Sequence, residues 1–248
     1  MNFQHPVFSP YQPEIAALAL DDGFPQLATL NALADARKLV NAHGLPLRFT
    51  LPDKPLAARD YEQQILQTGC IPTRTDTWHD VMNALVWLRF PHFKAGLNAA
   101  HAEAIATETG ALRGRRRDML TMLDESGVWV VSNSVSLCDL LRHREWQTLF
   151  WTQRAAVTTH MQFVVVGHAL LEKMCQPYAA ITGKCLLLEV DADLNSVEAQ
   201  ASLALAAIQS TDQLAPLPLM GIPGWDPHNA HAAYYANPAV FRPRPLTG

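Results

Sequence analysis

The chain has 248 residues, of which 49% are hydrophobic and 17% are charged, and its formal net charge is −4. Its apolar side chains suffice for a substantial core, and its slightly acidic balance gives no electrostatic reason to expect nucleic acid or an anionic membrane surface as a partner. The apolar stretches are too short to span a bilayer, so a small molecule is the partner that we expect.

Prolines interrupt the first sixty residues and leave one helical window at 24–41 and a possible short strand at 49–52. A helix is predicted over 61–68, where Gly69 supplies a left-handed cap. The next helix begins at Thr75, Asp76 or Thr77 and stops near Pro91, and another runs from about 93 to 109.

From Arg117 the pattern changes to alternation of apolar and polar residues, and turn residues at 124–127 are followed by a short apolar run. This pattern predicts a β-hairpin over about 117–133. Residues 136–139 resemble a capping box that opens a helix. We further predict strands at 158–166 and 184–190, and helices from Gly167 to before Pro177 and over 196–210.

The tail from 214 to 248 holds too many prolines for regular structure, but its apolar residues indicate that it wraps over the surface of the domain. The mixture of elements predicts a single α+β domain over 1–248, with helices packed on a small mixed sheet. Residues 1–60 would form an N-terminal arm and helix, 61–213 the core, and 214–248 the proline-rich wrap.

The four cysteines, Cys70, Cys138, Cys175 and Cys185, are scattered and form no CxxC pair. This spacing argues against a zinc knuckle and against a disulfide framework. The N-terminus also lacks the basic and apolar regions of a signal peptide. We therefore expect reduced, mostly buried thiols and a cytoplasmic location.

Several strings fall in one order along the chain: IPTRTDTWHDVMNALVWLRFPHFKAGLNAAH, RRRDMLTMLDESG, VVVGHALLEKMCQPY and APLPLMGIPGWDP. Together they resemble a bacterial family known only as a domain of unknown function, number 3025, over about residues 10–245. The resemblance implies a single bacterial domain and adds no activity, substrate or cofactor.

The first group of candidate site residues is His79, Asp80 and Asn83, in an apolar helical segment. His79 and Asn83 are four residues apart and share a helix face, whereas Asp80 points about 100° away. A histidine beside a carboxylate can act as a general base or a metal ligand. In the alternative interpretation, Asp80 pairs locally and the other two side chains satisfy neighbouring backbone.

The second group is His168 and Glu172, four residues apart on the first turns of a helix that follows a buried strand. This spacing lets both side chains reach one metal ion. It is equally typical of an ordinary His–Glu pair on a helix surface.

Further polar residues can contribute to a pocket. Asn98 and His101 share a face of the next helix, and Arg117 and Asp118 lie in a run of arginines that includes Arg113. Such arginines can hold a phosphate or carboxylate, although a solvated basic face is the commoner outcome. Asp124 and Glu125 are interpreted as turn residues.

No phosphate-binding glycine loop and no GxSxG motif is present, so two hypotheses remain. In the first, the chain is a metal-dependent hydrolase whose catalytic residues are His79, Asp80, His168 and Glu172. A divalent metal would be held by His79, His168 and Glu172. The substrate would be contacted by Asn83, Asn98, His101, Arg117 and Asp118. In the second, it is a non-catalytic binding domain whose polar residues form a structural network. An open cleft favours the first hypothesis and a sealed network the second.

Overall fold

The computed structural model describes residues 3–108, 114–190 and 194–244. Its N-terminal half is largely helical, with the helices α1 (Gln12–Ala17), α2 (Leu27–Ala36), α3 (Ala58–Thr68), α4 (Trp78–Arg89) and α5 (Pro91–Thr107). Two short strands, β1 (Arg48–Thr50) and β2 (Cys70–Pro72), pair in parallel beside them.

The second half combines helices with a four-stranded sheet. Its helices are α6 (Arg115–Ser126), α7 (Val135–His143), α8 (Arg154–His160), α9 (His168–Met174) and α10 (Leu194–Ala207), and its strands are β3 (Gly127–Ser132), β4 (Met161–Val165), β5 (Thr182–Leu188) and β6 (Ala215–Pro218). The strand order is β4-β3-β5-β6, where β3 and β5 are parallel and the outer pairs are antiparallel. This small mixed sheet with its helices confirms the predicted α+β class.

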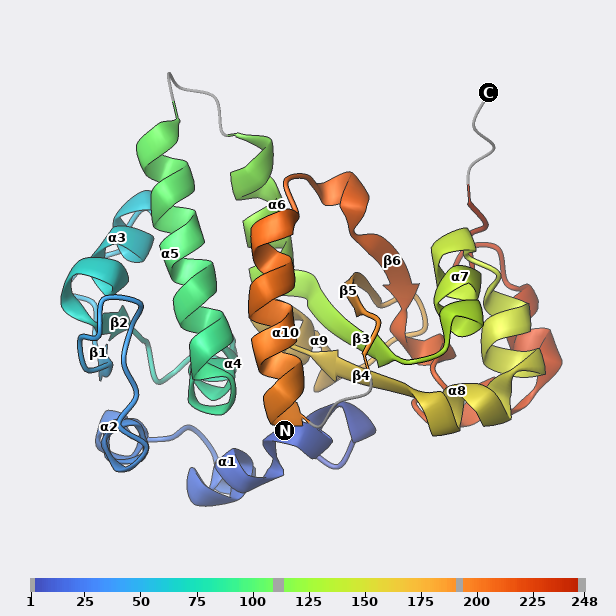
Figure 1. Cartoon of the computed structure of the whole chain (residues 1–248). Helices are drawn as coiled ribbons and strands as arrows, with labels where there is room; N and C mark the ends of the chain where they lie inside the picture. The colour runs from blue at the N-terminus through green and yellow to red at the C-terminus, as the bar shows by residue number, and fades with distance from the viewer. Residues whose placement is uncertain (1–2, 109–113, 191–193, 245–248) are drawn as a thin grey trace.

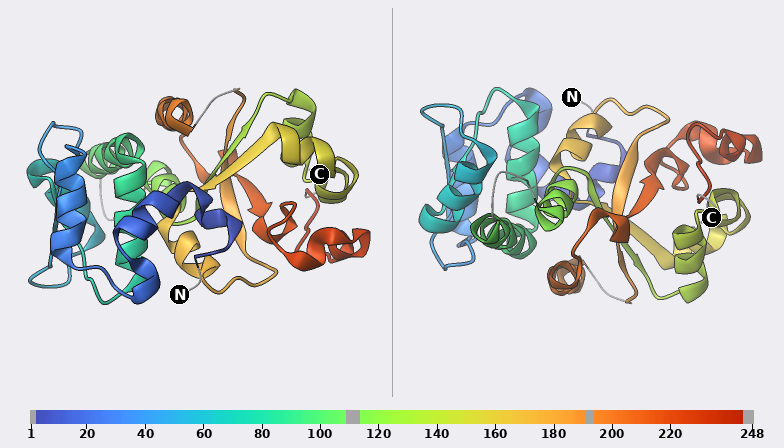
Figure 2. Two further views of the ribbon diagram at one scale, coloured as in Figure 1. Left: turned by 90° about the horizontal axis from the view of Figure 1, so that it is seen from below. Right: turned by 90° about the horizontal axis from the view of Figure 1, so that it is seen from above.

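The helices and the sheet occupy different parts of the molecule. Helices α2–α5 lie at one end, the C-terminal segment with α7 and α8 lies at the other, and the sheet with α6, α9 and α10 lies between them (Figures 1 and 2). Among the described residues, no helix combines the length and the apolar character needed to cross a membrane.

Strand β3 is the centre of the core, because every residue in it is buried. The ring of Trp129 on β3 packs edge-on against Phe90 and Phe93, with ring centroids 4.7 and 5.0 Å away. These two phenylalanines flank the start of α5, so the sheet and the α4–α5 helix pair share one apolar interior. Aromatic contacts of this kind add to the stabilisation from buried area.

The predicted β-hairpin over 117–133 is wrong. Residues 115–126 form α6, and only the second half of the predicted hairpin, β3, is a strand. Met119, Leu120 and Leu123 are fully buried, which is the spacing of a helix face rather than of a strand. The alternation was misleading because Met122 is also partly buried against the same core.

The predicted N-terminal helices are present, but α1 lies before the one helical window that was predicted among the first prolines. Helix α2 lies inside 24–41, and α3 ends at Gly69 in the left-handed conformation, with φ of 74°. Helix α4 follows Thr77, one of its three predicted start positions. Helix α5 ends at Thr107, and its predicted end at about 109 falls outside the described residues.

Three predictions in the second half need correction. Helix α7 begins at Val135 after Ser134, so Ser136 lies inside the helix and does not cap it. The segment predicted as a strand from 158 is the end of α8 as far as His160, and β4 begins at Met161. The tail does contain regular structure, since β6 pairs with β5 despite its prolines. Proline is tolerated there because β6 is the edge strand of the sheet.

The remainder of the described tail packs on the domain as the apolar residues predicted. The side chain of Asn229 is fully buried and donates to the carbonyl oxygens of Met220 and Ile222, at 2.9 and 2.7 Å. The hydroxyl of Tyr235 donates to the carbonyl of Gly221. These bonds hold the proline-rich segment in one conformation, and Nε1 of Trp146 ties it to the rest of the domain by donating to the carbonyl of Arg242 at 2.9 Å.

Candidate functional site

A cavity of about 890 Å³ opens between α3, α4, α5, α6 and α9 and the loops at 51–58 and 72–76. An open cavity of this size is typical of a small-molecule site. Several of the residues singled out in the sequence line it. The titratable and amide side chains on its wall include Tyr61, Glu62, His79, Asp80, Asn83, His101, Arg117, Asp124 and His168.

A close backbone contact brings α9 to this cavity. A side chain at Gly167 would place its Cβ 2.5 Å from the backbone nitrogens of Ser126 and Gly127, so only glycine fits there. The amide of Gly167 donates to the carbonyl of Gly127 at 2.9 Å. The start of α9 is thereby held against the end of α6, and His168 lies next to Asp124.

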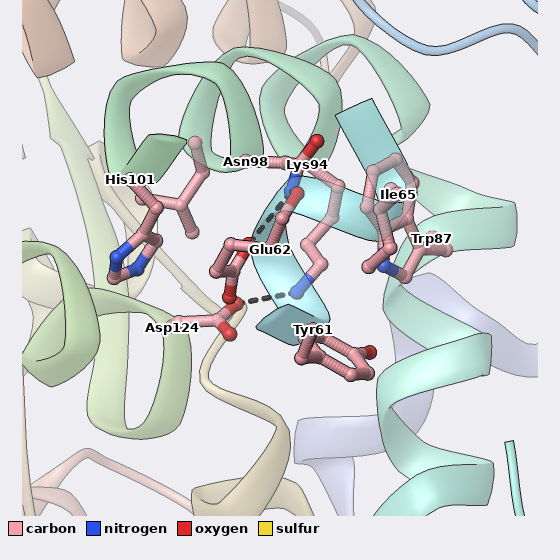
Figure 3. A pocket seen from close by; sticks show the side chains of 9 residues that line it. Tyr61, Glu62, Ile65, Trp87, Lys94, Asn98, His101 and Asp124 are labelled. Atoms are coloured by element: carbon pink, nitrogen blue, oxygen red, sulfur yellow. Dashed lines mark hydrogen bonds and ion pairs between the residues drawn. The ribbon is translucent and has the colours of Figure 1, made fainter. Parts of the chain in front are cut away.

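At the inner wall of the cavity, Asp124 on α6 forms a buried ion pair with Lys94 on α5, which lines the small void behind the cavity (Figure 3). Only 5% of the Lys94 side chain and 16% of the Asp124 side chain are exposed. Burial alone would raise the pKa of Asp124, but the positive charge of Lys94 and the nearby His168 lower that pKa to about 2. Asp124 is therefore a carboxylate at neutral pH.

Glu62 on α3 lies beside this ion pair and behaves differently (Figure 3). Burial and, next, the negative charge of Asp124 raise the pKa of Glu62 to about 7. Asn98 holds the side chain in place, because its Nδ2 donates to Oε2 of Glu62 at 2.7 Å and to the Glu62 carbonyl at 2.9 Å. Glu62 can thus gain and lose a proton near neutral pH.

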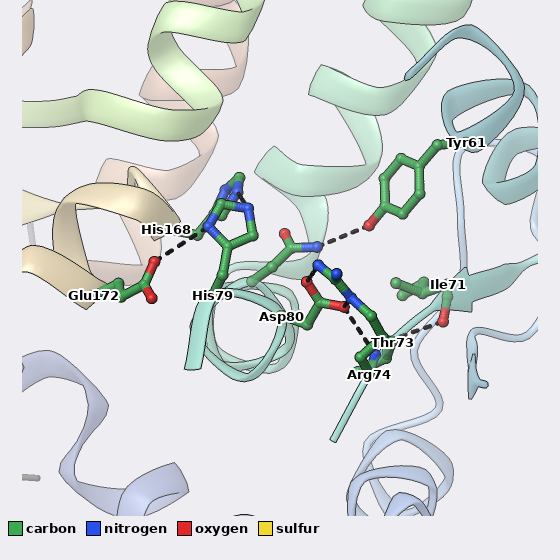
Figure 4. Close-up of polar contacts among 9 residues, drawn as sticks. Tyr61, Ile71, Thr73, Arg74, His79, Asp80, His168 and Glu172 are labelled. Atoms are coloured by element: carbon green, nitrogen blue, oxygen red, sulfur yellow. Dashed lines mark hydrogen bonds and ion pairs between the residues drawn. The ribbon is translucent and has the colours of Figure 1, made fainter. Parts of the chain in front are cut away.

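His79, His168 and Glu172 form a row of contacts on the neighbouring wall (Figure 4). Nδ1 of His79 lies 3.3 Å from Oε2 of Glu172, and its Nε2 lies 3.1 Å from Nε2 of His168. Nδ1 of His168 lies 3.7 Å from Oδ2 of Asp124, which is an electrostatic contact rather than a hydrogen bond. Burial lowers the pKa of His168 to about 4, so its ring is neutral at pH 7.

Several predicted site residues are bound to partners of their own. Asp80 accepts two hydrogen bonds from the guanidinium of Arg74, each 2.9 Å long, and points away from His79 (Figure 4). Nδ2 of Asn83 donates to the hydroxyl of Tyr61 at 2.8 Å. Asp80 therefore matches the local pairing of the alternative interpretation, although it still lines the cavity.

The arginine run contributes little to the cavity. Arg117 lines it but forms an ion pair with Glu108 at 3.2 Å, and Asp118 is exposed and does not line it. Arg113 lies outside the described residues. His101 is buried and lines the cavity together with a small void behind it, whereas Asn98 lines only the void.

The three predicted metal ligands do not face one common point. His79 lies between Glu172 and His168 and uses one ring nitrogen toward each of them. Within the described ranges, no three His, Cys, Asp or Glu side chains are grouped as metal ligands are. The row is instead a chain of polar contacts that leads from the half-exposed Glu172 to the buried Asp124.

Sequence reasoning missed the residues at the inner wall. Asp124 was interpreted as a turn residue because the helix α6 was predicted as a hairpin. Lys94 carried a usable signal, since it lies in an apolar segment of α5, between Phe93 and Ala95, where a lysine needs a buried partner. For Glu62 the sequence offered no comparable signal, because it lies on a polar helix.

Comparison with known proteins identifies the family. The family model described as "Protein of unknown function (DUF3025)" matches residues 47–245, which is most of the chain. No curated protein and no solved structure matches the chain. The resemblance seen in the sequence is confirmed, and the chain belongs to the DUF3025 family.

Proposed function

We propose that this protein is a hydrolase that binds a small molecule in the cavity and uses Glu62 for general acid–base catalysis. The observation that carries the proposal is the setting of Glu62: it lines the cavity, Asn98 fixes its carboxyl group, and its pKa is raised to about 7. A catalytic acid or base works best when its pKa is close to the working pH, and such values cluster at functional sites.

The proposed chemistry uses both protonation states of Glu62. In its ionised form, Glu62 takes a proton from a water molecule in the cavity, which makes the water a better nucleophile. The protonated acid then returns the proton to the leaving group. Lys94 keeps Asp124 ionised beside it, and the negative charge of Asp124 raises the proton affinity of Glu62. Asp124 and Lys94 therefore act as positioning residues for this carboxyl group.

The exposure of the polar residues supports a site over a purely structural network. The His79 and Glu172 side chains are 42% and 39% exposed, and the cavity is open to solvent. A network that served only stability would be shielded from solvent and mutually bonded, as the Arg117–Glu108 pair is. Both kinds of contact are present, and the exposed His79–Glu172 contact is the one that differs from a sealed network.

The test is a hydrolysis screen of chromogenic esters, amides and phosphoesters with the wild-type protein and with Glu62→Gln. Loss of a general acid or base lowers turnover by about 10²–10⁴-fold, and the melting temperature should not fall. Glu103→Gln makes the same chemical change on an exposed part of α5 and should retain full turnover. Equal turnover by Glu62→Gln and the wild type would refute the role of Glu62. Small-molecule binding without turnover would instead favour the non-catalytic binding domain.

A second candidate function is a metal-dependent hydrolase, favoured by one distance. The Nε2 atoms of His79 and His168 are 3.1 Å apart, close to the roughly 3.3 Å between two nitrogens on one tetrahedral zinc ion. A divalent metal between them would supply an activated water, with further ligands from water or substrate. Elemental analysis of protein purified without chelator tests this candidate. Stoichiometric metal in the wild type, lost in His79→Ala and His168→Ala, would support it, and metal-free wild type would refute it.

The cysteines bear on where such an enzyme works. Cys138, Cys175 and Cys185 are buried, Cys70 is partly exposed, and none of the four is in a disulfide. Burial raises the pKa of Cys175 to about 11, which makes it a poor nucleophile. Free thiols support a reducing compartment, so we place the proposed activity in the bacterial cytoplasm.

A further inference from the structure

We propose that the ligand of the cavity carries a protonated amine, and that this amine binds between Glu62 and Asn83, with an apolar body toward the cavity mouth. The inference rests on the proposed function for the identity of the site and adds the chemical class of the substrate. Three independent features of the cavity lead to it: its charges, an unpartnered buried acceptor and its apolar rim.

The charges of the inner wall leave one carboxylate without its own cation. The cations that influence Glu62 are Lys94 and Arg117, and each is bound to another carboxylate, Asp124 and Glu108 respectively. Arg74, nearer the mouth, is bound to Asp80. An added positive charge at Glu62 would complete the pairing, whereas an added anion would face Glu62 and Asp124 together.

The amide oxygen of Asn83 supplies the second feature. Asn83 is only 9% exposed and lines the cavity, and its Oδ1 accepts no hydrogen bond from any described residue. Its Nδ2 is already used, since it donates to Tyr61. Buried acceptors are almost always satisfied in folded proteins, and a donor on a bound ligand would satisfy this one. An ammonium group has three N–H donors and no acceptor.

The mouth of the cavity supplies the third feature. The loop from 51 to 56 and Pro72 line it with five apolar side chains, beside the charged side chains of Asp53 and Lys54; the apolar ones are Leu51, Pro52, Pro55, Leu56 and Pro72. The side chain of Leu51 is 62% exposed, so it is accessible to a ligand. A hydrocarbon body attached to the amine would bury this rim, and ligand cavities commonly combine an apolar wall with a few polar anchors.

Binding of an amine also has a protonic signature. The pKa of Glu62 is raised to about 7 by burial and by Asp124, so close to half of the molecules hold a proton there at pH 7. A cation beside the carboxyl group favours its ionised form. Amine binding should therefore release up to about half a proton per site at pH 7.

The test is isothermal titration calorimetry of the full chain with three probes of equal length: n-hexylammonium, n-hexanol and hexanoate. The titrations are run at pH 7 with EDTA in two buffers that differ in ionisation enthalpy, so that proton release is measured directly. We expect n-hexylammonium to bind with proton release, n-hexanol to bind at least about tenfold more weakly, and hexanoate not to bind up to about 10 mM.

Matched variants identify the residues. Glu62→Gln should weaken n-hexylammonium binding by at least about tenfold and abolish proton release, whereas Glu103→Gln should change neither. Asn83→Leu keeps the side-chain size and should weaken binding while proton release persists. This second variant keeps the test decisive if Glu62→Gln fails to fold.

Three results would overturn the proposal: hexanoate binding as tightly as the amine, unchanged amine affinity in both Glu62→Gln and Asn83→Leu, or no amine binding up to about 10 mM. In a separate titration without EDTA, binding of Zn²⁺ or Mg²⁺ by a protein that does not bind the amine would overturn it in favour of the metal candidate. Calorimetry needs no turnover, so amine binding can succeed where hydrolysis fails. Hydrolysis of an anionic substrate would leave the proposed function intact and refute only the amine.

Discussion

Replacement of Glu62 by glutamine should stabilise the protein, and the gain should depend on pH. The substitution keeps the shape of the side chain and retains an oxygen that accepts the hydrogen bond from Asn98. It removes the negative charge that must otherwise be held close to Asp124. At high pH the wild type bears this cost, and the variant does not.

The size of the effect follows from the two pKa values of Glu62. The folded-state pKa of about 7 lies above the unfolded value of 4.5, so the stability that the protonated acid supplies is complete below pH 4.5 and is lost as pH rises through about 7. The variant should therefore match the wild type near pH 4, exceed its free energy of unfolding by about 1 kcal/mol at pH 5.5, and exceed it by about 3 kcal/mol at pH 8. Partial solvent exposure of Glu62 makes the last value an upper limit.

The assay is urea unfolding of both proteins at pH 4, 5.5 and 8, with Glu103→Gln as the control of equal charge change. The control should differ from the wild type by a small amount that does not vary with pH, because Glu103 is exposed. A gap between Glu62→Gln and the wild type that is constant across pH would refute the reasoning. So would a variant that is less stable than the wild type at pH 8.

Three other predictions concern the same region. Through His168, the wild type should lose about 2–3 kcal/mol of stability between pH 7 and pH 4.5, because the pKa of the buried His168 ring is lowered to about 4 while the unfolded chain takes up the proton. The variant His168→Gln should lack this loss, and urea unfolding at the two pH values checks it. Lys94→Met should lower the free energy of unfolding by about 3–5 kcal/mol, because Asp124 is left without its cation, and the double variant with Asp124→Leu should recover most of this loss. A Lys94→Met variant as stable as the wild type would contradict this prediction. Gly167→Ala should lower the free energy of unfolding by about 2 kcal/mol or more, because its Cβ would clash with the backbone. Gly96→Ala, whose Cβ meets nothing within 4 Å on a helix, should raise it by about 0.5–1 kcal/mol. Thermal unfolding distinguishes the two variants.

The local sequence pattern is sufficient to predict some of the helices. Helix α3 and its glycine cap, and the start of α4, follow from residues within one or two turns of each other. The hairpin prediction failed at 115–126 because alternation over seven residues is also compatible with a helix that has neighbours on two sides. Helix α6 packs against both α5 and α9, so apolar residues on more than one of its faces are buried.

In the candidate site, too, some features follow from local spacing and others only from tertiary contacts. His79 and Asn83 both line the cavity, and Asn98 and His101 both line the small void behind it, so each pair lies on one part of its helix. The contact between His79 and His168 joins residues 89 positions apart, and the Lys94–Asp124 pair joins residues 30 positions apart. Neither contact leaves a periodic signal in the sequence.

The sequence by itself determined the α+β class, most of the helices, the central strand β3 and the family of the chain. Only the tertiary structure decided that Glu62, Lys94 and Asp124 meet beside His168 at one cavity. The physical reason is that periodicity states which face of a helix is apolar, whereas the identity of the face that it meets depends on how all the elements pack together. The pKa of Glu62 depends on that packing, because burial and the charge of Asp124 act only after α3 and α6 have come together.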